Sequence, residues 1–146
     1  KQAEKMTANL SRAHIYLTFL VIALGTLVTG SGPHAGDEDS RRFGFDIRSV
    51  SVLHADAVIA LLGLTLALYV AARSNPLHLR RILIFTVIAL AQGAIGYIQY
   101  FTGIPEILVA AHLLGATLVW IAAWRIRLAI TTSPIHTPSS KVGENS

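Results

Sequence analysis

Four long hydrophobic runs alternate with polar segments along the chain. They cover about residues 14–29, 50–72, 82–101 and 105–124. A helix needs about 20 mostly apolar residues to cross about 30 Å of hydrocarbon. The pattern therefore predicts an all-α fold, an integral membrane four-helix bundle within residues 14–127. Charged residues border the runs: Arg12, Arg48, Arg73, Arg80, Arg81, Arg125 and Arg127.

The segments outside these runs are polar. Residues 1–13 are predicted to be a cytoplasmic N-terminal segment, and residues 128–146 a disordered cytoplasmic tail. Pro105 follows a Thr-Gly-Ile turn and suits the first turn of the fourth helix. The chain begins with Lys rather than Met, which indicates a processed or trimmed protein, or part of a longer one.

The distribution of basic residues predicts the orientation of the bundle. Nine of the twelve Lys and Arg residues lie beside the two ends of the chain or in the loop between the second and third runs. The other three, Arg41, Arg42 and Arg48, lie near the first loop, with four acidic residues. By the positive-inside rule, both termini are expected in the cytoplasm. The basic residues therefore indicate topology and membrane lipid contacts, and no nucleic-acid partner is expected.

Composition agrees with a membrane protein and narrows the chemistry. The chain is 53% hydrophobic and 14% charged, against about 45–50% and about 25% in an ordinary soluble domain. It has no cysteine, which excludes disulfides, thiolate metal sites and a cysteine nucleophile within it.

Two of the six histidines lie inside apolar runs, whereas His14 is expected at the membrane interface and His78 in a basic loop. His54 is eight residues past Asp46, and His112 is six past Glu106, so both are expected about 9–12 Å below the same end of the bundle. Two imidazoles at one depth on facing helices can be the axial ligands of a heme iron. The alternative is that each histidine bonds a neighbouring helix. We favour heme for the pair.

Residues near the two histidines are compatible with a heme, and small residues at these spacings also suit plain helix packing. Gly115 and Ala116 are small neighbours of His112 on its helix, and Gln92, Gly96 and Gln99 share one stripe of the third helix. Arg41 and Arg42, on the same side as the histidines, are candidates to bind heme propionates, because Arg forks suit carboxylates. Alternatively they pair with the acidic residues of their own loop. Asp56 is expected to bond another helix.

Three ordered strings resemble the C-terminal half of bacterial heme A synthases. They are TGSGPHAGD (29–37), LHAD (53–56) and QGAIGYIQYFTGIPEILVAAH (92–112), and the resemblance covers about residues 14–125. It implies a protein of the bacterial plasma membrane in which His54 and His112 are axial ligands of heme b. The family's other half holds the heme O pocket, with a second histidine pair and a Glu-x-x-x-His-like motif. Neither that motif nor the cysteine pair of many members is present here.

The resemblance implies that the whole enzyme oxidises the heme O methyl group to the formyl group of heme A, for cytochrome oxidase assembly. This chain would be the half that relays electrons, with no catalytic residue of its own. Its partners would be the N-terminal half of the synthase, heme O as substrate of the whole enzyme, and heme O synthase as a further candidate. Two alternatives remain: an independent membrane cytochrome b with a bis-His heme, and a heme-less structural membrane subunit.

Overall fold

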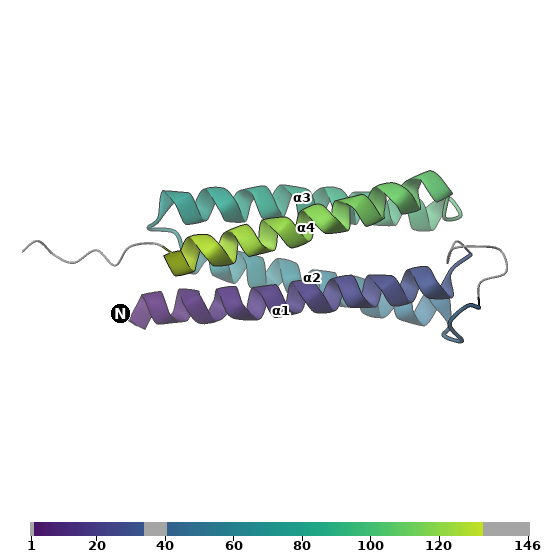
Figure 1. Cartoon of the computed structure of the whole chain (residues 1–146), viewed down its shortest axis with the longest axis horizontal. Coiled ribbons are helices and arrows are strands. Elements are labelled where there is room, and N and C mark those ends of the chain that lie inside the picture. Colours follow the sequence, from purple (N-terminus) through teal and green to yellow (C-terminus); the bar gives the residue numbers. More distant parts are fainter. Residues whose placement is uncertain (1, 34–40, 133–146) are drawn as a thin grey trace, which may run out of the picture.

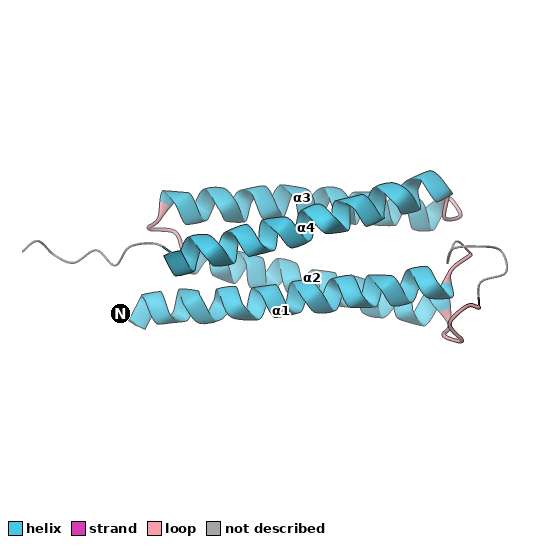
Figure 2. Ribbon diagram, in the orientation of Figure 1, coloured by secondary structure: helices cyan, strands magenta, loops and turns pink. Residues whose placement is uncertain are grey.

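The computed structural model describes residues 2–33 and 41–132, and within them it consists of four helices without a strand (Figure 2). Helix α1 spans Gln2–Ser31, α2 spans Ile47–Ala71, α3 spans Pro76–Phe101, and α4 spans Glu106–Thr132. All four are long and apolar enough to cross a membrane. The predicted four-helix membrane bundle is therefore confirmed.

The helices run up and down as two hairpins, α1–α2 and α3–α4 (Figure 1). Besides its hairpin partner, α1 packs against α4, whereas α2 and α3 touch over a much smaller area and α1 does not contact α3. Near the N-terminus α4 lies beside α1, and it moves away from α1 towards the other end (Figure 1). The hairpins are therefore closest at one end of the bundle.

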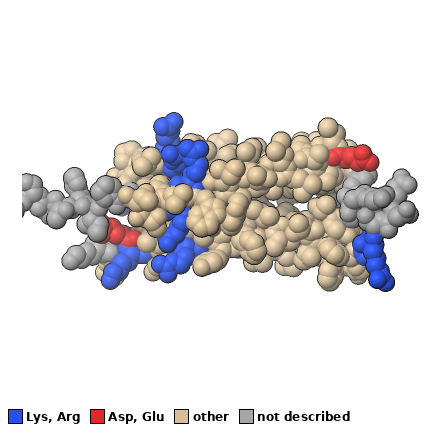
Figure 3. Space-filling model, in the orientation of Figure 1, with Lys and Arg blue, Asp and Glu red and all other residues tan. Residues whose placement is uncertain are grey.

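We call that end the basic end, because most Lys and Arg side chains lie there. Figure 3 shows them as a belt across the bundle. Within the described part of the chain the residues are Lys5, Arg12, Arg73, Arg80, Arg81, Arg125 and Arg127. Charges at this level and long apolar surfaces beyond it are the pattern of a helix bundle that enters a bilayer.

The core lies mainly in the half of the bundle next to the basic end. Leu68, Ile82, Phe85 and Ile126, from three helices, are at most 1% exposed. Many large apolar side chains point outward instead; Phe101 and Ile107 are each 77% exposed. Outward apolar side chains suit hydrocarbon, since lipid tails are as apolar as the side chains themselves.

The helices extend beyond the predicted spans. The prediction that residues 1–13 are only a flanking segment missed that α1 begins at Gln2, and α4 continues to Thr132, past the predicted boundary at residue 127. Hydropathy marks the part of a helix that suits lipid, whereas helix formers such as Gln, Ala, Glu, Lys and Met prolong the hydrogen-bond ladder into water. The rest of the predicted tail, residues 133–146, lies outside the described residues.

The α3–α4 turn sets the two helices of the second hairpin antiparallel. The amide of Ile104 donates to the carbonyl of Gln99 at 2.8 Å, and Gly103 has φ +80°, which together make a Schellman end for α3. Ile104 has φ +60°, a region that β-branched residues rarely adopt. Pro105 then begins the approach to α4, as the sequence indicated.

Asp46 caps the start of α2, at the end opposite the basic belt. Its carboxylate accepts hydrogen bonds from the Ser49 amide at 2.8 Å and the Ser49 hydroxyl at 2.7 Å. The hydroxyl bond and then the amide bond hold the pKa of the Asp46 carboxyl below its usual value. Because the folded state prefers the ionised carboxyl, the cap stabilises α2 above the ordinary pKa and is lost as the pH falls through the lowered one.

We predict that Asp46→Ala frays the first turn of α2, whereas Asp46→Asn, which still accepts a hydrogen bond, does not. Amide hydrogen exchange should become faster at residues 47–50 in Asp46→Ala, and stay unchanged in the first turn of α4. At acid pH the native chain should approach the Ala variant, while the Asn variant shows no such pH dependence. Equal exchange in the native and Ala chains at neutral pH would show that Asp46 is not a working cap.

Candidate functional site

His54 lies on α2, in the half of the bundle away from the basic end, and its ring is held by α1. Its Nδ1 is 3.0 Å from the backbone carbonyl oxygen of Val21. A carbonyl oxygen can only accept, so Nδ1 must carry the proton and donate it. The lone pair is then on Nε2. Histidines that bind metals commonly have this second hydrogen bond, which fixes both tautomer and ring orientation.

A glycine brings the His54 ring close to the α1 backbone. A β-carbon at position 25 would lie 3.2 Å from Cε1 of His54 and 3.6 Å from Nδ1. That is tighter than ordinary side-chain packing, so a larger residue would push the ring outward. Gly25 stands one helical turn after Val21, which accepts the Nδ1 hydrogen bond. The two α1 residues together set the position of the imidazole.

His112 lies on α4 and packs against α3 in the same way. A β-carbon at position 96 would lie 3.3 Å from Cε1 of His112. Each hairpin thus presents one histidine from its second helix against one glycine of its first helix. The two histidines that the sequence singled out therefore occupy matching positions on the two hairpins.

Several buried polar atoms in the half of the bundle away from the basic end lack a hydrogen-bond partner. Among the described residues they are Nδ1 of His112, Oε1 of Gln92, Oε1 of Gln99 and Oγ of Ser31. All belong to the half of the bundle away from the basic end, and none to the tightly packed half. Buried polar groups are rarely left unpaired in native proteins. These four atoms are therefore available to a ligand or to trapped water.

The residues present fit a heme better than a metal ion bound by protein alone. No cluster of three or more His, Cys, Asp or Glu side chains suited to a metal ion occurs within residues 2–33 and 41–132. A porphyrin supplies four nitrogen ligands, so a heme iron needs only two from the protein. One imidazole already has its tautomer fixed for ligation, and both rest on glycines.

Gly115, a small neighbour of His112, contributes to helix packing. A β-carbon at Gly115 would overlap the side-chain amide of Gln92, so Gln92 covers Gly115. Gly115 is buried and serves the packing of α3 on α4. The space beside His112 at this level is filled by an amide of the chain rather than left for a macrocycle.

Arg42 returns to the end of α1, in the same half of the bundle as the histidines. Nη1 of Arg42 donates to the carbonyl oxygen of Gly32, and the amide of Phe43 donates to the carbonyl of Gly30 at 3.0 Å. These two hydrogen bonds give partners to the carbonyls of Gly30 and Gly32 at the end of α1. A guanidinium has five N–H donors, so the Gly32 bond leaves others of Arg42 for a carboxylate ligand. Arg41 is exposed.

His14 and His78 have structural surroundings. His14, expected at an interface, is 1% exposed: its Nε2 is 3.1 Å from the Thr65 hydroxyl, and its ring meets Phe85 edge-on at 4.5 Å. Since the Thr65 hydroxyl donates to the Leu61 carbonyl, it accepts from His14. His78, expected in a loop, lies in the first turn of α3 and donates to the carbonyl of Ala129.

The spacing of polar residues on α1 could have revealed the burial of His14. Thr7, Ser11, His14 and Thr18 recur at intervals of four, three and four, which puts them on one helix face, and all four are buried. Asp56, expected to bond another helix, is exposed on α2, and no such bond is seen in the described part of the chain. His34 and His136 lie outside the described residues.

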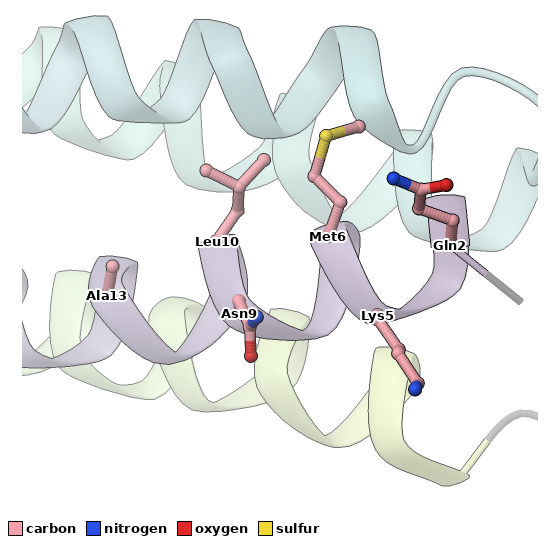
Figure 4. A pocket seen from close by; sticks show the side chains of 6 residues that line it. All are labelled: Gln2, Lys5, Met6, Asn9, Leu10 and Ala13. Carbon is pink, nitrogen blue, oxygen red and sulfur yellow. The ribbon is translucent and has the colours of Figure 1, made fainter.

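A hollow near the N-terminus does not belong to this site. Its lining residues are all on α1: Gln2, Lys5, Met6, Asn9, Leu10 and Ala13 (Figure 4). They bring one charged group and no histidine or carboxylate, and the hollow lies at the basic end. We therefore assign no cofactor to it.

Comparisons with known proteins give no family assignment. No protein-family model, curated protein or solved structure matches the chain. The resemblance to heme A synthases remains a hypothesis that rests on the quoted strings.

We predict that His54 of the heme-free protein has its proton on Nδ1 at neutral pH. Nitrogen-15 NMR of histidine-labelled protein distinguishes protonated from unprotonated ring nitrogens, and the spectrum of His54→Ala assigns the signals. Gly25→Leu should displace the ring from the Val21 carbonyl and change these signals. Gly63→Leu is the matched control, because a β-carbon there meets nothing within 4 Å. A proton on Nε2 in the native chain would contradict the assignment.

Proposed function

We propose that the chain binds one b-type heme between His54 and His112, and that it is the electron-relaying half of a heme A synthase. The observation that carries the heme proposal is the Val21 carbonyl at 3.0 Å from Nδ1 of His54, which leaves Nε2 as the ligating nitrogen. The glycines under both rings and the unpartnered polar atoms in the same half of the bundle support it.

The chain's residues would hold the cofactor from two hairpins. His54 of α2 and His112 of α4 would each supply one axial nitrogen, and Arg41 and Arg42 are the candidates to bind the propionates. The bond from Nδ1 to Val21 would keep the His54 ring oriented and make it a stronger ligand. A bis-imidazole heme b supplies reversible one-electron transfer at its iron.

Electron transfer is the chemistry that the proposed enzyme requires from this half. Conversion of a methyl to a formyl group adds the oxygen of one water and releases four protons and four electrons. Two axial imidazoles would leave no position for substrate, so this site suits relay rather than methyl oxidation. The substrate pocket would then lie in the N-terminal half.

The position of the basic belt supports the orientation. By the positive-inside rule, the basic end would face the cytoplasm of a bacterial plasma membrane, and the histidine pair would lie towards the outer side. Impermeant thiol reagents should label Gly44→Cys from outside intact cells and leave Ser74→Cys unlabelled. The reverse result would invert the orientation.

We predict a low-spin, six-coordinate heme spectrum from the purified chain. Either His54→Ala or His112→Ala should give a five-coordinate spectrum or abolish heme retention, because one axial ligand is lost. His78→Gln is the control, since that side chain bonds α4 at the basic end. A low-spin spectrum that survives in the double variant His54→Ala/His112→Ala would refute the proposed ligands.

Removing a propionate ligand should change the redox potential without changing the spin state. We predict this for Arg41→Ala and Arg42→Ala, and no change for Arg80→Ala at the basic end. Spectroelectrochemical titration of the reduced and oxidised bands measures the difference. Similar shifts in all three variants would show that the two arginines have no particular contact with the cofactor.

The identity of the hemes extracted from cells distinguishes a heme A synthase half from an independent cytochrome b. In a bacterial strain that makes heme O but lacks heme A synthase, this chain alone should yield no heme A. Co-expression with the N-terminal half of a bacterial heme A synthase should restore it, and His112→Ala should abolish that gain. Heme A made by the chain alone would mean that this chain holds the catalytic site. If co-expression with the N-terminal half yields no heme A, an independent cytochrome b is favoured.

A further inference from the structure

A groove between α1 and α4 opens on the surface of the bundle at the basic end. Its volume is about 520 Å³. Two arginines and four aromatic side chains dominate its lining: Arg12, Tyr16 and Phe19 from α1, and Trp120, Trp124 and Arg127 from α4. Tyr16 and Phe19 are 69% and 61% exposed, so the aromatic wall faces outward. The groove lies away from the histidine pair.

The charged and aromatic residues of the groove lie at different depths. Phe19 is seven residues after Arg12, and Trp120 is seven residues before Arg127, so on antiparallel helices both aromatic rings are about 10 Å deeper than the arginines. The ring centroids of Phe19 and Trp120 are 6.2 Å apart, and those of Trp120 and Trp124 are 5.9 Å apart. A continuous aromatic surface therefore runs inward from a pair of positive charges.

One of the two arginines is held in place by α1. Nη1 of Arg127 donates to the Ser11 hydroxyl at 3.0 Å and to the Ala8 carbonyl at 3.3 Å. These bonds use one of its three nitrogens and orient the guanidinium beside the groove. The planar fork is then already positioned for an anionic oxygen, which lowers the entropy cost of binding one. Arg12 is exposed and can approach from the other wall.

We propose that this groove binds an anionic phospholipid of the leaflet at the basic end. Its phosphate would lie between Arg12 and Arg127, and one acyl chain would run along the aromatic surface formed by Phe19, Trp120 and Trp124. The groove is cationic at the level of the headgroups and apolar below it. An anionic lipid has its charged headgroup and its acyl chain at the same two depths. A transmembrane helix of another protein would cover the rings but would need acidic groups at the level of the arginines.

The chain's own tryptophans make the proposal measurable. It contains two, Trp120 and Trp124, and both line the groove. Bromine on an acyl chain quenches indole fluorescence on contact. The full chain would be placed in phosphatidylcholine vesicles with a minor fraction of brominated phosphatidylglycerol or of brominated phosphatidylcholine. Each signal is divided by that of the same lipid without bromine, which removes quenching by any other group.

Brominated phosphatidylglycerol should quench with a preference of roughly fivefold or more over brominated phosphatidylcholine, as expected from one or two phosphate–arginine contacts. Arg12→Gln and Arg127→Gln should each reduce this preference. Arg125→Gln, with the same charge change but outside the groove, should retain it. Circular dichroism verifies that each variant is helical, and Arg12→Gln alone suffices if Arg127→Gln fails to fold.

Three results would overturn the proposal. Equal quenching by the two brominated lipids would show that the groove does not select the anionic headgroup. An equal loss of preference in Arg125→Gln and Arg12→Gln would mean that the belt attracts anionic lipids without a defined site. Quenching by both lipids could also be weak at high protein density and become stronger when the protein is diluted in the bilayer. That result would show that a second copy of the chain covers the groove.

Discussion

Close packing at the basic end determines how the rest of the bundle can be arranged. Leu68, Ile82, Phe85 and Ile126 meet there with almost no exposed surface. Protein interiors of this density tolerate little displacement, so the contacts fix the crossing of the helices. From this clamped end α4 moves away from α1 along the bundle (Figure 1). The half that carries the two histidines is therefore held by contacts within each hairpin more than between them.

The two halves of the bundle also differ in how their buried polar groups are hydrogen-bonded. In the packed half, His14 donates to Thr65 and His78 to the Ala129 carbonyl. In the other half, His112, Gln92 and Gln99 each hold a buried polar atom without a partner within the described residues. Backbone and side-chain polar groups in hydrocarbon must be satisfied by protein, ligand or trapped water. The unpaired groups thus occur where the hairpins are least engaged with each other.

The membrane-spanning helices could be predicted from the sequence because the ability to span depends only on properties of one continuous segment. Length and hydropathy over about 20 residues decide whether a helix can span, and Pro105 and Gly103 mark the last turn. The start of α1 and the end of α4 could not be predicted in this way. Hydropathy indicates which residues suit lipid, but it does not indicate where a helix ends outside the lipid. Depth along a helix also follows from residue number, which is why His54 and His112 could be paired.

What the sequence could not provide is the contact between helices. The bond from His54 to the Val21 carbonyl joins residues 33 apart and depends on the rotation of α1 against α2. The same rotation buries His14 and turns Asp56 outward, and both were misjudged. Gly25 and Gly96 show the difference clearly, because which side chain each glycine admits required the structure.

The separation of the two imidazoles onto different hairpins has a consequence for sensing. If one iron joins His54 and His112, its coordination number depends on the distance between two units that are firmly packed only at their far end. Any event that spreads the hairpins, such as bilayer thinning or the departure of a partner half, would stretch or break an iron–nitrogen bond. The electronic state of the iron would then report mechanical changes in the surrounding membrane.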